Sequence, residues 1–153
     1  MARIFIGFAS MSGNTEEMAD LIKGRLEGDH DIHLDEIEEI EPDFLVGFDA
    51  VLLGSYTWND GDLPYEVEDF YEDLEDIDLT GKCIAAFGSG DTSYPQFCEA
   101  VSLFENRLTA VGGERMTEGW KVDMHPDKEE DLTRLQVFTD EIIEHLGRLI
   151  QLK

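Results

Sequence analysis

The sequence predicts a doubly wound α/β domain, in which helices cover both faces of a parallel sheet. Short apolar runs of strand length alternate with segments of helical periodicity, and the strand-like runs are continuously apolar. Such runs are typical of strands buried on both faces, and strand–helix–strand units give right-handed parallel connections. About 150 residues is an ordinary domain length and no linker or repeat divides the chain, so we expect a single domain, residues 1–153.

The expected strands and helices follow one another along the chain. Strands are expected at residues 4–8, 32–37, 50–53, 84–87 and 120–122, of which the second and fifth are weaker. Helical periodicity covers residues 18–26, 67–74, 97–108 and 132–149. Between residues 37 and 47 the helical pattern is weak and Pro42 interrupts it, so this connection is the least defined.

The composition excludes several classes of partner. Lys and Arg total 11 against 36 Asp and Glu, which gives a formal charge of -25. This charge repels phosphate backbones and anionic lipids, so neither nucleic acid nor a membrane is an expected partner. A protein partner should instead present a basic patch. No apolar run approaches 18 residues, and we interpret the two cysteines as reduced thiols, so we expect a cytoplasmic protein and a monomer.

Three loops are the expected ligand site. In doubly wound sheets, ligands bind beyond the carboxyl ends of the strands, where the strand order reverses. The loops that follow the first, third and fourth strands are residues 10–15, 55–63 and 88–97. We therefore expect these three segments to meet.

The first of these loops is rich in groups that bind an anion. Side-chain donors are expected from Ser10, Ser12, Asn14 and Thr15, and Gly13 allows the backbone to close around a phosphate. The loop contains no Lys or Arg and matches neither the Walker nor the dinucleotide motif, which argues against nucleoside triphosphates and NAD. A single phosphate monoester remains. A simple turn and helix cap would use the same residue types, so this loop alone does not distinguish a phosphate site from a structural turn.

The other two loops carry aromatic residues where a purely structural loop is usually small and polar. Trp58 follows the third strand and Tyr94 follows the fourth, so the two rings are placed to sandwich a flat ligand. Stacking contributes about 0.5–1.5 kcal/mol for each face beyond area burial. Either ring alone is equally well explained by packing. The two together, beside a phosphate loop, indicate FMN.

The three loops together resemble a known family. The motifs Ser-Met-Ser-Gly-Asn-Thr, Tyr-Thr-Trp-Asn-Asp-Gly and Gly-Ser-Gly-Asp-Thr-Ser-Tyr occur in this order after the first, third and fourth strands. The sequence thereby resembles a short-chain flavodoxin, similar to those of Bacillus-type bacteria. The resemblance implies a flavodoxin-like five-stranded sheet of order 2-1-3-4-5. It also implies a low-potential one-electron carrier that holds FMN non-covalently, without turnover of a substrate of its own.

The resemblance also assigns roles to individual residues. It implies that Ser10, Ser12, Asn14 and Thr15 hold the phosphate together with the backbone of Met11 and Gly13. Thr57, Trp58, Asn59 and Asp60 would line one face of the flavin and its N5 edge, and Ser89, Asp91 and Tyr94 the other face. The remaining expected cofactor-binding residues are Ser55, Tyr56, Gly61, Gly90, Phe97 and Cys98.

Asn59 departs from the family pattern, because many relatives have Gly at this position. The peptide after it is expected to flip when the flavin takes up one electron, and the flipped turn can require a positive φ, which Gly adopts freely. Asn59→Gly is therefore predicted to stabilise the one-electron-reduced flavin by at most about 1 kcal/mol.

The charges near the flavin predict the redox role of the protein. Asp60, Asp62, Glu66, Glu68 and Asp69 are among the carboxylates that follow the second ligand loop, and each opposes addition of an electron to the ring. We therefore expect low potentials and docking on basic-surfaced redox proteins, such as a ferredoxin/flavodoxin–NADP reductase and acceptor oxidoreductases. A solvated acidic helix face is the alternative interpretation of these charges.

Three other functions are weighed against the carrier. A small FMN-dependent quinone or flavin reductase needs a substrate pocket that these short loops scarcely provide. A phospho-acceptor receiver needs acidic residues where this chain has Ser10 and Ser55. A flavoprotein that activates one metalloenzyme would typically lack so complete an aromatic pair. His30, His33, His125 and His145 show no paired metal spacing, so no metal site is expected.

Overall fold

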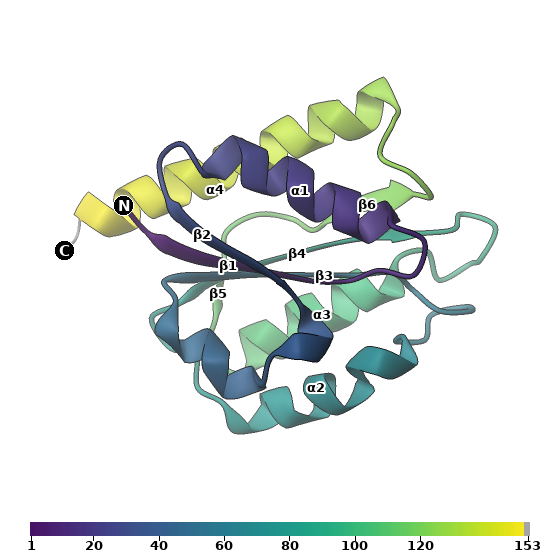
Figure 1. The fold of residues 1–153 in the computed structure, drawn as a ribbon, viewed down its shortest axis with the longest axis horizontal. Coiled ribbons are helices and arrows are strands. Elements are labelled where there is room, and N and C mark those ends of the chain that lie inside the picture. Colours follow the sequence, from purple (N-terminus) through teal and green to yellow (C-terminus); the bar gives the residue numbers. More distant parts are fainter. Residues whose placement is uncertain (152–153) are drawn as a thin grey trace.

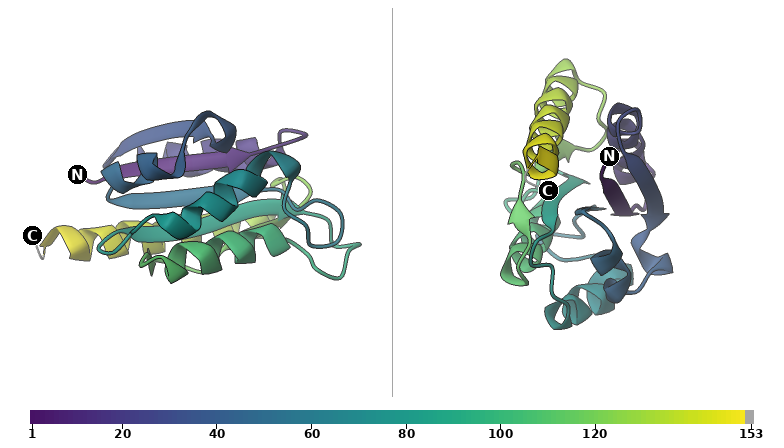
Figure 2. Two further views of the ribbon diagram at one scale, coloured as in Figure 1. Left: turned by 90° about the horizontal axis from the view of Figure 1, so that it is seen from below. Right: turned by 90° about the vertical axis from the view of Figure 1, so that its left-hand side faces the viewer.

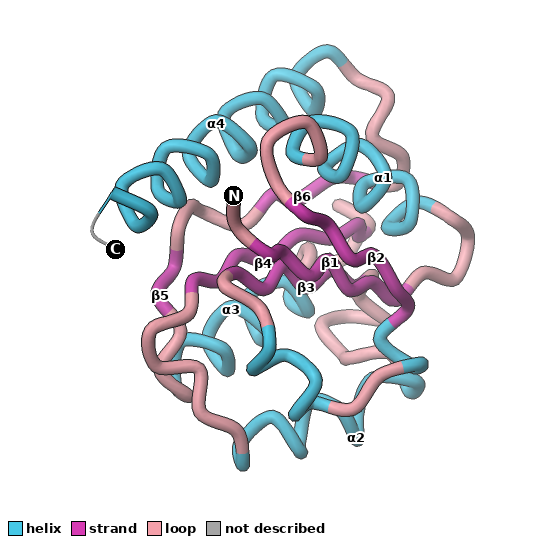
Figure 3. The backbone as a smooth tube through the Cα atoms, turned by 60° about the vertical axis from the view of Figure 1, so that its left-hand side comes forward, coloured by secondary structure: helices cyan, strands magenta, loops and turns pink. Residues whose placement is uncertain are grey.

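A computed structural model, which describes residues 1–151, places a parallel sheet between two layers of helices (Figure 1). The strands are β1 (Arg3–Ala9), β2 (Asp31–Glu36), β3 (Ala50–Ser55), β4 (Cys83–Gly90), β5 (Glu114–Arg115) and β6 (Trp120–Asp123). Their order is β2-β1-β3-β4-β5, and β6 also pairs with β4. Figure 3 shows the strands, in magenta, in the middle of the molecule between the helices. The predicted sheet order is confirmed.

The fifth position of the sheet is shared by two short strands. The start of β4 pairs with β5, where Cys83 lies opposite Glu114, and the end of β4 pairs with β6, where Phe87 lies opposite Trp120. Residues 116–119 separate the two pieces. The strand predicted at residues 120–122 is thus confirmed as β6, and its two-residue partner β5 is an element that the sequence did not suggest.

The four α-helices cover both faces of the sheet (Figure 2). They are α1 (Asn14–Leu26), α2 (Glu68–Asp73), α3 (Glu99–Ala110) and α4 (Glu129–Gln151). One apolar cluster joins the sheet to α1 and α4 and contains Ile22, Trp120 and Ile142. A second cluster on the opposite face joins it to α2 and α3 and contains Phe70 and Phe104. Both faces of the central strands are therefore buried, as their continuous apolar sequence predicts.

The connection from β2 to β3 contains no α-helix. Two 3₁₀ segments, Ile37–Glu39 and Pro42–Gly47, take its place. Pro42 stands at the start of the second segment, where its missing N–H costs nothing. The α2 region is also short, since its six residues lie between the 3₁₀ turns Tyr65–Val67 and Leu74–Asp76. The weak pattern of residues 37–47 thus corresponds to 3₁₀ turns, and the helix predicted at residues 67–74 is present as α2 with a 3₁₀ turn at each end.

The carboxyl ends of β1, β3 and β4 point to the same end of the molecule, opposite both chain termini (Figure 1). The loops predicted to bind a ligand leave the sheet at this end. Within residues 1–151, no helix combines the length and apolar character needed to cross a bilayer.

Candidate functional site

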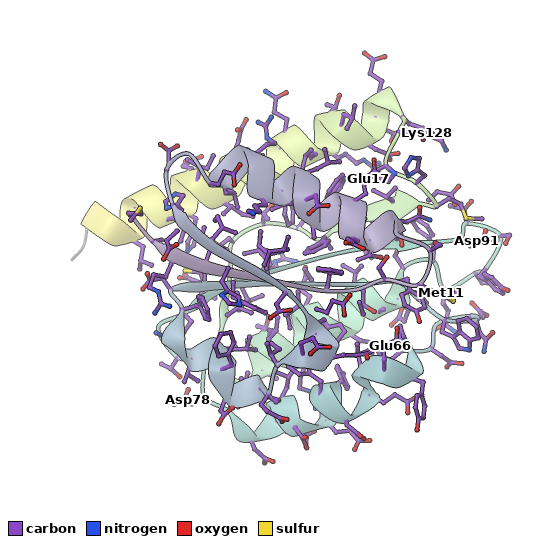
Figure 4. The ribbon with its side chains drawn as sticks, in the orientation of Figure 1. Met11, Glu17, Glu66, Asp78, Asp91 and Lys128 are labelled. Atoms are coloured by element: carbon purple, nitrogen blue, oxygen red, sulfur yellow. The ribbon has the colours of Figure 1, made fainter. Side chains whose placement is uncertain are left out.

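A cleft of about 270 Å³ lies between the three loops at the carboxyl edge of the sheet. Figure 4 labels Met11 and Asp91, which come from the first and third of these loops and lie at this end of the molecule. The residues that line the cleft are Ser10, Met11, Ser12, Asn14, Thr15, Tyr56, Thr57, Trp58, Asn59, Ser89, Gly90, Asp91, Tyr94 and Met124. Asp91 is the one charged side chain among them.

The loop between β1 and α1 forms an anion cradle. Gly13 has a φ of 90°, which a residue without Cβ adopts easily, and its N–H donates to Ser10 Oγ over 3.0 Å. The α1 helix begins at the next residue, Asn14, so the N–H groups of its first turn have no partner within the helix. These groups and the helix dipole favour an anion at this point.

Buried hydrogen bonds hold the three loops together beneath the cleft. The hydroxyls of Thr15 and Ser89 lie 2.8 Å apart in a buried contact, which joins the start of α1 to the end of β4. Thr57 N–H donates to the Ser89 carbonyl over 3.3 Å, and Thr57 Oγ1 accepts from Ala100 N–H in α3 over 3.0 Å. The cleft walls are therefore fixed to the sheet and to α3 before any ligand arrives.

Two large rings stand partly exposed at the rim of the cleft. The relative exposure of Trp58 is 45% and that of Tyr94 is 43%, although most large rings of the chain are buried. Trp58 and Asp62 exchange two backbone hydrogen bonds of 2.8 and 2.9 Å, which close a tight hairpin. Asn59 lies in this hairpin with a φ of 48°. Asn59 thus already has a positive φ in this structure, and both the flip of the following peptide and the effect of Asn59→Gly on the flavin stay predictions.

The third loop is folded by its own side chains. Asp91 Oδ1 accepts from the N–H of Ser93 over 2.9 Å and from its hydroxyl over 2.7 Å, and these bonds hold the pKa of the Asp91 carboxyl below its ordinary value. Tyr94 N–H donates to the Asp91 carbonyl over 3.1 Å. Thr92 donates to the Asp123 carboxylate at the end of β6. This turn sets the position of the Tyr94 ring.

Six residues predicted to bind the cofactor do not line the cleft. They are Gly13, Ser55, Asp60, Gly61, Phe97 and Cys98. Ser55 is buried and its hydroxyl donates to the Tyr56 carbonyl. Asp60 accepts from Gln96 N–H over 2.9 Å and so links the second loop to the third. Phe97 packs on Cys98 and Val101 in a small apolar cluster.

Cys98 supports the cleft from behind. The Sγ atom contacts the carbonyl oxygens of Gly88 and Val122 at 3.6 and 3.8 Å, and burial raises the pKa of this thiol to about 12. A Cβ on Gly90 would lie 2.8 Å from Cys98 Sγ. Close packing of this thiol against β4 therefore fixes the backbone on which Ser89 and Asp91 sit.

Met124 is a lining residue that the sequence analysis missed. It follows β6 with a φ of 64°, and its N–H donates to the Gly90 carbonyl over 2.8 Å. The signal was its place immediately after the fifth strand position, since the rule that ligands bind beyond strand ends applies to that loop too. The side chain is 53% exposed at the cleft.

A second hollow lies on the other side of the Trp58 hairpin. It is lined by Trp58, Asn59, Gly61, Asp62, Leu63, Tyr65, Glu68, Tyr71, Glu72 and Leu103. Trp58 thus separates this acidic hollow from the cleft. Tyr56, beside it, donates to Glu66 over 2.8 Å, and burial together with this carboxylate raises the pKa of its phenol.

The cleft fits a mononucleotide. Its phosphate end offers hydroxyls, amides and free N–H groups without a basic side chain, and its outer end offers two exposed rings for a flat heterocycle. Among the residues that the structure describes, no Walker-type lysine lines the cleft, which argues against the β- and γ-phosphates of a nucleoside triphosphate. The fold and this site together define a doubly wound, mononucleotide-binding protein.

Comparisons with known proteins give the family. The flavodoxin family profile matches residues 6–136. Probable flavodoxin 1 of Bacillus subtilis (strain 168) is 48% identical over 139 residues, which cover 90% of this chain and 88% of that protein. Oxidised flavodoxin 2 from Bacillus cereus is 51% identical, with a TM-score of 0.91 over 94% of this chain and 99% of that one. The chain belongs to the flavodoxin family.

The family establishes the general function. Flavodoxins are FMN-binding electron carriers and not enzymes, and this chain has their short-chain size. A flavodoxin of Fusobacterium nucleatum, bound to flavin mononucleotide, shares the fold with a TM-score of 0.79 at 20% identity. The predictions of an FMN carrier without substrate turnover are thereby confirmed.

Proposed function

We propose that the cleft between the three loops is the FMN site and that the chain passes single low-potential electrons to basic-surfaced redox proteins. The observation that carries the proposal is the pair of exposed rings, Trp58 and Tyr94, beside an uncharged anion cradle. The cradle residues 10–15 hold the phosphate, and the two rings flank the flavin. When bound, FMN supplies the redox chemistry, and the protein supplies its position and its electrostatic surroundings.

The electrostatic surroundings favour low potentials. Within residues 1–151, no Lys or Arg lines the cleft, and Asp91 is its one charged group. Asp62, Glu68 and Glu72 lie in the hollow directly behind Trp58. Added electron density on the ring is therefore repelled and finds no cation to offset it. We propose that this repulsion keeps the flavin a good reductant.

The acidic hollow behind Trp58 is the proposed docking surface. Its charged side chains are Asp62, Glu68 and Glu72, and no Lys or Arg of the described part of the chain lines it. A basic patch on a partner, such as a ferredoxin/flavodoxin–NADP reductase or an acceptor oxidoreductase, is complementary to it. Since Trp58 lines both the hollow and the cleft, a partner docked there lies one indole ring from the cofactor.

The expected compartment is a reducing one, and we propose the cytoplasm. Neither Cys83 nor Cys98 forms a disulfide, and both are buried. Reduced cysteines are the rule where glutathione and thioredoxin act.

Electron transfer from a basic-surfaced NADPH-dependent reductase tests the docking surface. The double variant Glu68→Gln/Glu72→Gln should lower the second-order rate constant in stopped-flow experiments and flatten its dependence on salt, because steering charges act on association. The matched control Glu39→Gln/Asp43→Asn removes two carboxylates from a separate acidic hollow near β2, whose lining shares no residue with the proposed docking surface, and should leave the rate close to wild type. Equal losses in both variants would show that only the net charge matters and would refute this docking surface.

A further inference from the structure

Three side chains that commonly bind metals meet at the end of the sheet opposite the FMN cleft. They are Cys83, Glu114 and His145, and their candidate ligand atoms all lie within 4.8 Å of one another. The cluster joins the starts of β4 and β5 to the last third of α4, on the side where both chain termini lie (Figure 1). We propose that it is a binding site for a divalent transition metal ion of the zinc class.

The fold itself brings these three residues together. Cys83 and Glu114 are the first residues of two parallel strands and lie opposite each other in register, so their side chains project from the same face of the sheet. That face is covered by α4, because Cys83 belongs to the same apolar cluster as Leu146. His145 precedes Leu146, and its Nε2 lies 3.3 Å from Glu114 Oε2.

The distances suit a tetrahedral ion. Metal–ligand bonds of about 2.0–2.3 Å place neighbouring ligand atoms of a tetrahedron roughly 3.3–3.8 Å apart. The His145–Glu114 distance already falls within that interval, and the limit of 4.8 Å for the whole cluster needs only small rotations of the side chains.

The burial of the cluster gives the site a closed side and an open side. Cys83 is 1% exposed and forms the floor, while the side chains of His145 and Glu114 are 17% and 69% exposed. An ion would enter past the exposed carboxylate of Glu114, and the fourth position would face water. Three protein ligands with one water is an arrangement that zinc adopts.

The donor set selects the metal. Thiolate and imidazole suit Zn²⁺ and related ions, whereas Mg²⁺ and Ca²⁺ take oxygen ligands. The formal charge of -25 attracts cations in general, but it cannot distinguish one divalent ion from another. Preference for zinc over magnesium must therefore come from Cys83 and His145. The sequence alone did not indicate this site, because its three ligands lie in separate elements, β4, β5 and α4.

Calorimetric titration of the FMN-loaded protein with ZnCl₂ in excess Mg²⁺ tests the proposal. We expect one zinc ion per chain, and His145→Gln or Glu114→Gln should weaken binding by more than about tenfold, since even outer-shell changes around a metal cost that much. The control is His125→Gln: the His125 Nδ1 lies 2.8 Å from Glu17 Oε2, so it removes a similar exposed pair that has no thiol beside it. The control should bind zinc as the wild type does.

X-ray absorption at the zinc edge gives an independent readout. A sulfur neighbour at about 2.3 Å is expected in the wild type and should be lost in Cys83→Ser. Flavin absorbance and the thermal midpoint without metal show whether each variant folds, and His145→Gln tests the site even if Cys83→Ser does not fold. Several weak zinc ions that bind equally to His145→Gln and His125→Gln, or a shell without sulfur, would overturn the proposal. Neither result bears on the proposed FMN site, because flavin binding is measured separately by its absorbance.

Discussion

Two residues at the rim of the cleft, Trp58 and Tyr94, are proposed to hold the flat ring of the flavin. Trp58 and Tyr94 are each less than half exposed, and each stands on a loop fixed by backbone hydrogen bonds. Aromatic residues on strand-end loops were the strongest sequence signal for the site, because such loops are otherwise small and polar. The one sequence signal for Met124 is its place after the fifth strand position, because its flexible thioether, unlike an aromatic ring, marks no ligand site.

Trp58→Ala should weaken FMN binding about twofold to tenfold, which corresponds to the roughly 0.5–1.5 kcal/mol that one stacked face contributes. Titration of the apoprotein with FMN, followed by quenching of flavin fluorescence, measures this change. Tyr65→Ala is the matched control, because Tyr65 is 87% exposed and lies outside the cleft lining. Equal affinities for Trp58→Ala and wild type would contradict the stacking role.

His30 gives the folded chain a defined response to acid. The ring is buried and its Nδ1 accepts from Ala2 N–H over 3.1 Å, and burial lowers the pKa of this histidine below 6.5. The unfolded chain therefore binds a proton more readily, so the contribution of His30 is fully present above pH 6.5 and is lost as the pH falls below it. The unfolding free energy of wild type relative to His30→Gln should decrease between about pH 7.5 and about pH 5.5. Urea titrations measure this difference in unfolding free energy at each pH. A difference that stays constant or grows as the pH falls would contradict the role of His30.

Among the secondary-structure elements, β3 and β4 approach each other closely beneath the cleft, where Gly88 of β4 lies against Ser55 of β3. A Cβ on Gly88 would overlap the Ser55 carbonyl oxygen and lie 2.8 Å from Val101 Cγ2. β3 ends just beyond this point, at Ser55, whereas β4 continues to Gly90 in its pairing with β6, and Tyr56 and Ser89 line the cleft there. Glycine at position 88 therefore allows the close packing of β3 against β4 and the position of the cleft residues that follow them.

Gly88→Ala should destabilise the protein by about 1–3 kcal/mol, the usual cost of overpacking, and weaken FMN binding as well. Gly147→Ala is the opposite case, since a Cβ there meets nothing within 4 Å and Gly147 lies inside α4. It should stabilise the protein by about 0.5–1 kcal/mol and leave FMN binding unchanged. Urea denaturation measures both changes, and a neutral Gly88→Ala would show that the strands can separate freely.

Elements with a clear apolar pattern were predictable, including the short β6, whereas the 3₁₀ turns and the two-residue β5 were not. The apolar runs of β1, β3 and β4 and the amphipathic segments of α1, α3 and α4 were all identified from sequence, because burial on two faces or one stripe leaves a clear period. The 3₁₀ turns between β2 and β3 are too short for a period to show. The two-residue β5 is held by pairing with β4, which is a tertiary effect.

The same distinction applies to the site. The three loops were predicted because strand ends of a parallel sheet meet at one edge. Which loop residues point into the cleft depends on turn geometry and on contacts between loops, such as Asp60 with Gln96 and Cys98 with Gly88. Those contacts turn Asp60 and Cys98 away from the cleft, and no local pattern in the sequence encodes them.

At the scale of the whole molecule, the excess of acidic groups works against the folded state. A formal charge of -25 repels itself more strongly in the compact chain than in the unfolded one. The ion pairs of the described residues are mostly exposed, with Arg134–Glu130 and Arg148–Glu144 as examples, so they contribute little in compensation.

Added salt should therefore stabilise the FMN-loaded protein. Raising NaCl from about 0.05 to about 0.5 M shortens the screening length from roughly 14 to 4 Å and so weakens the self-repulsion. The thermal midpoint in excess FMN should rise, and sucrose of equal osmolality, which screens no charge, separates screening from solute exclusion. A midpoint that falls with salt would mean that attractive ion pairs dominate.

A crystal structure of the FMN-loaded protein would show where the flavin binds and is the strongest test of the proposed site. The predicted result is a phosphate within hydrogen-bond distance of the cradle at Ser10–Thr15 and a ring held between Trp58 and Tyr94. The contradicting result is a flavin seated elsewhere, for instance in the cleft of about 420 Å³ between α3 and α4 that Trp120 lines.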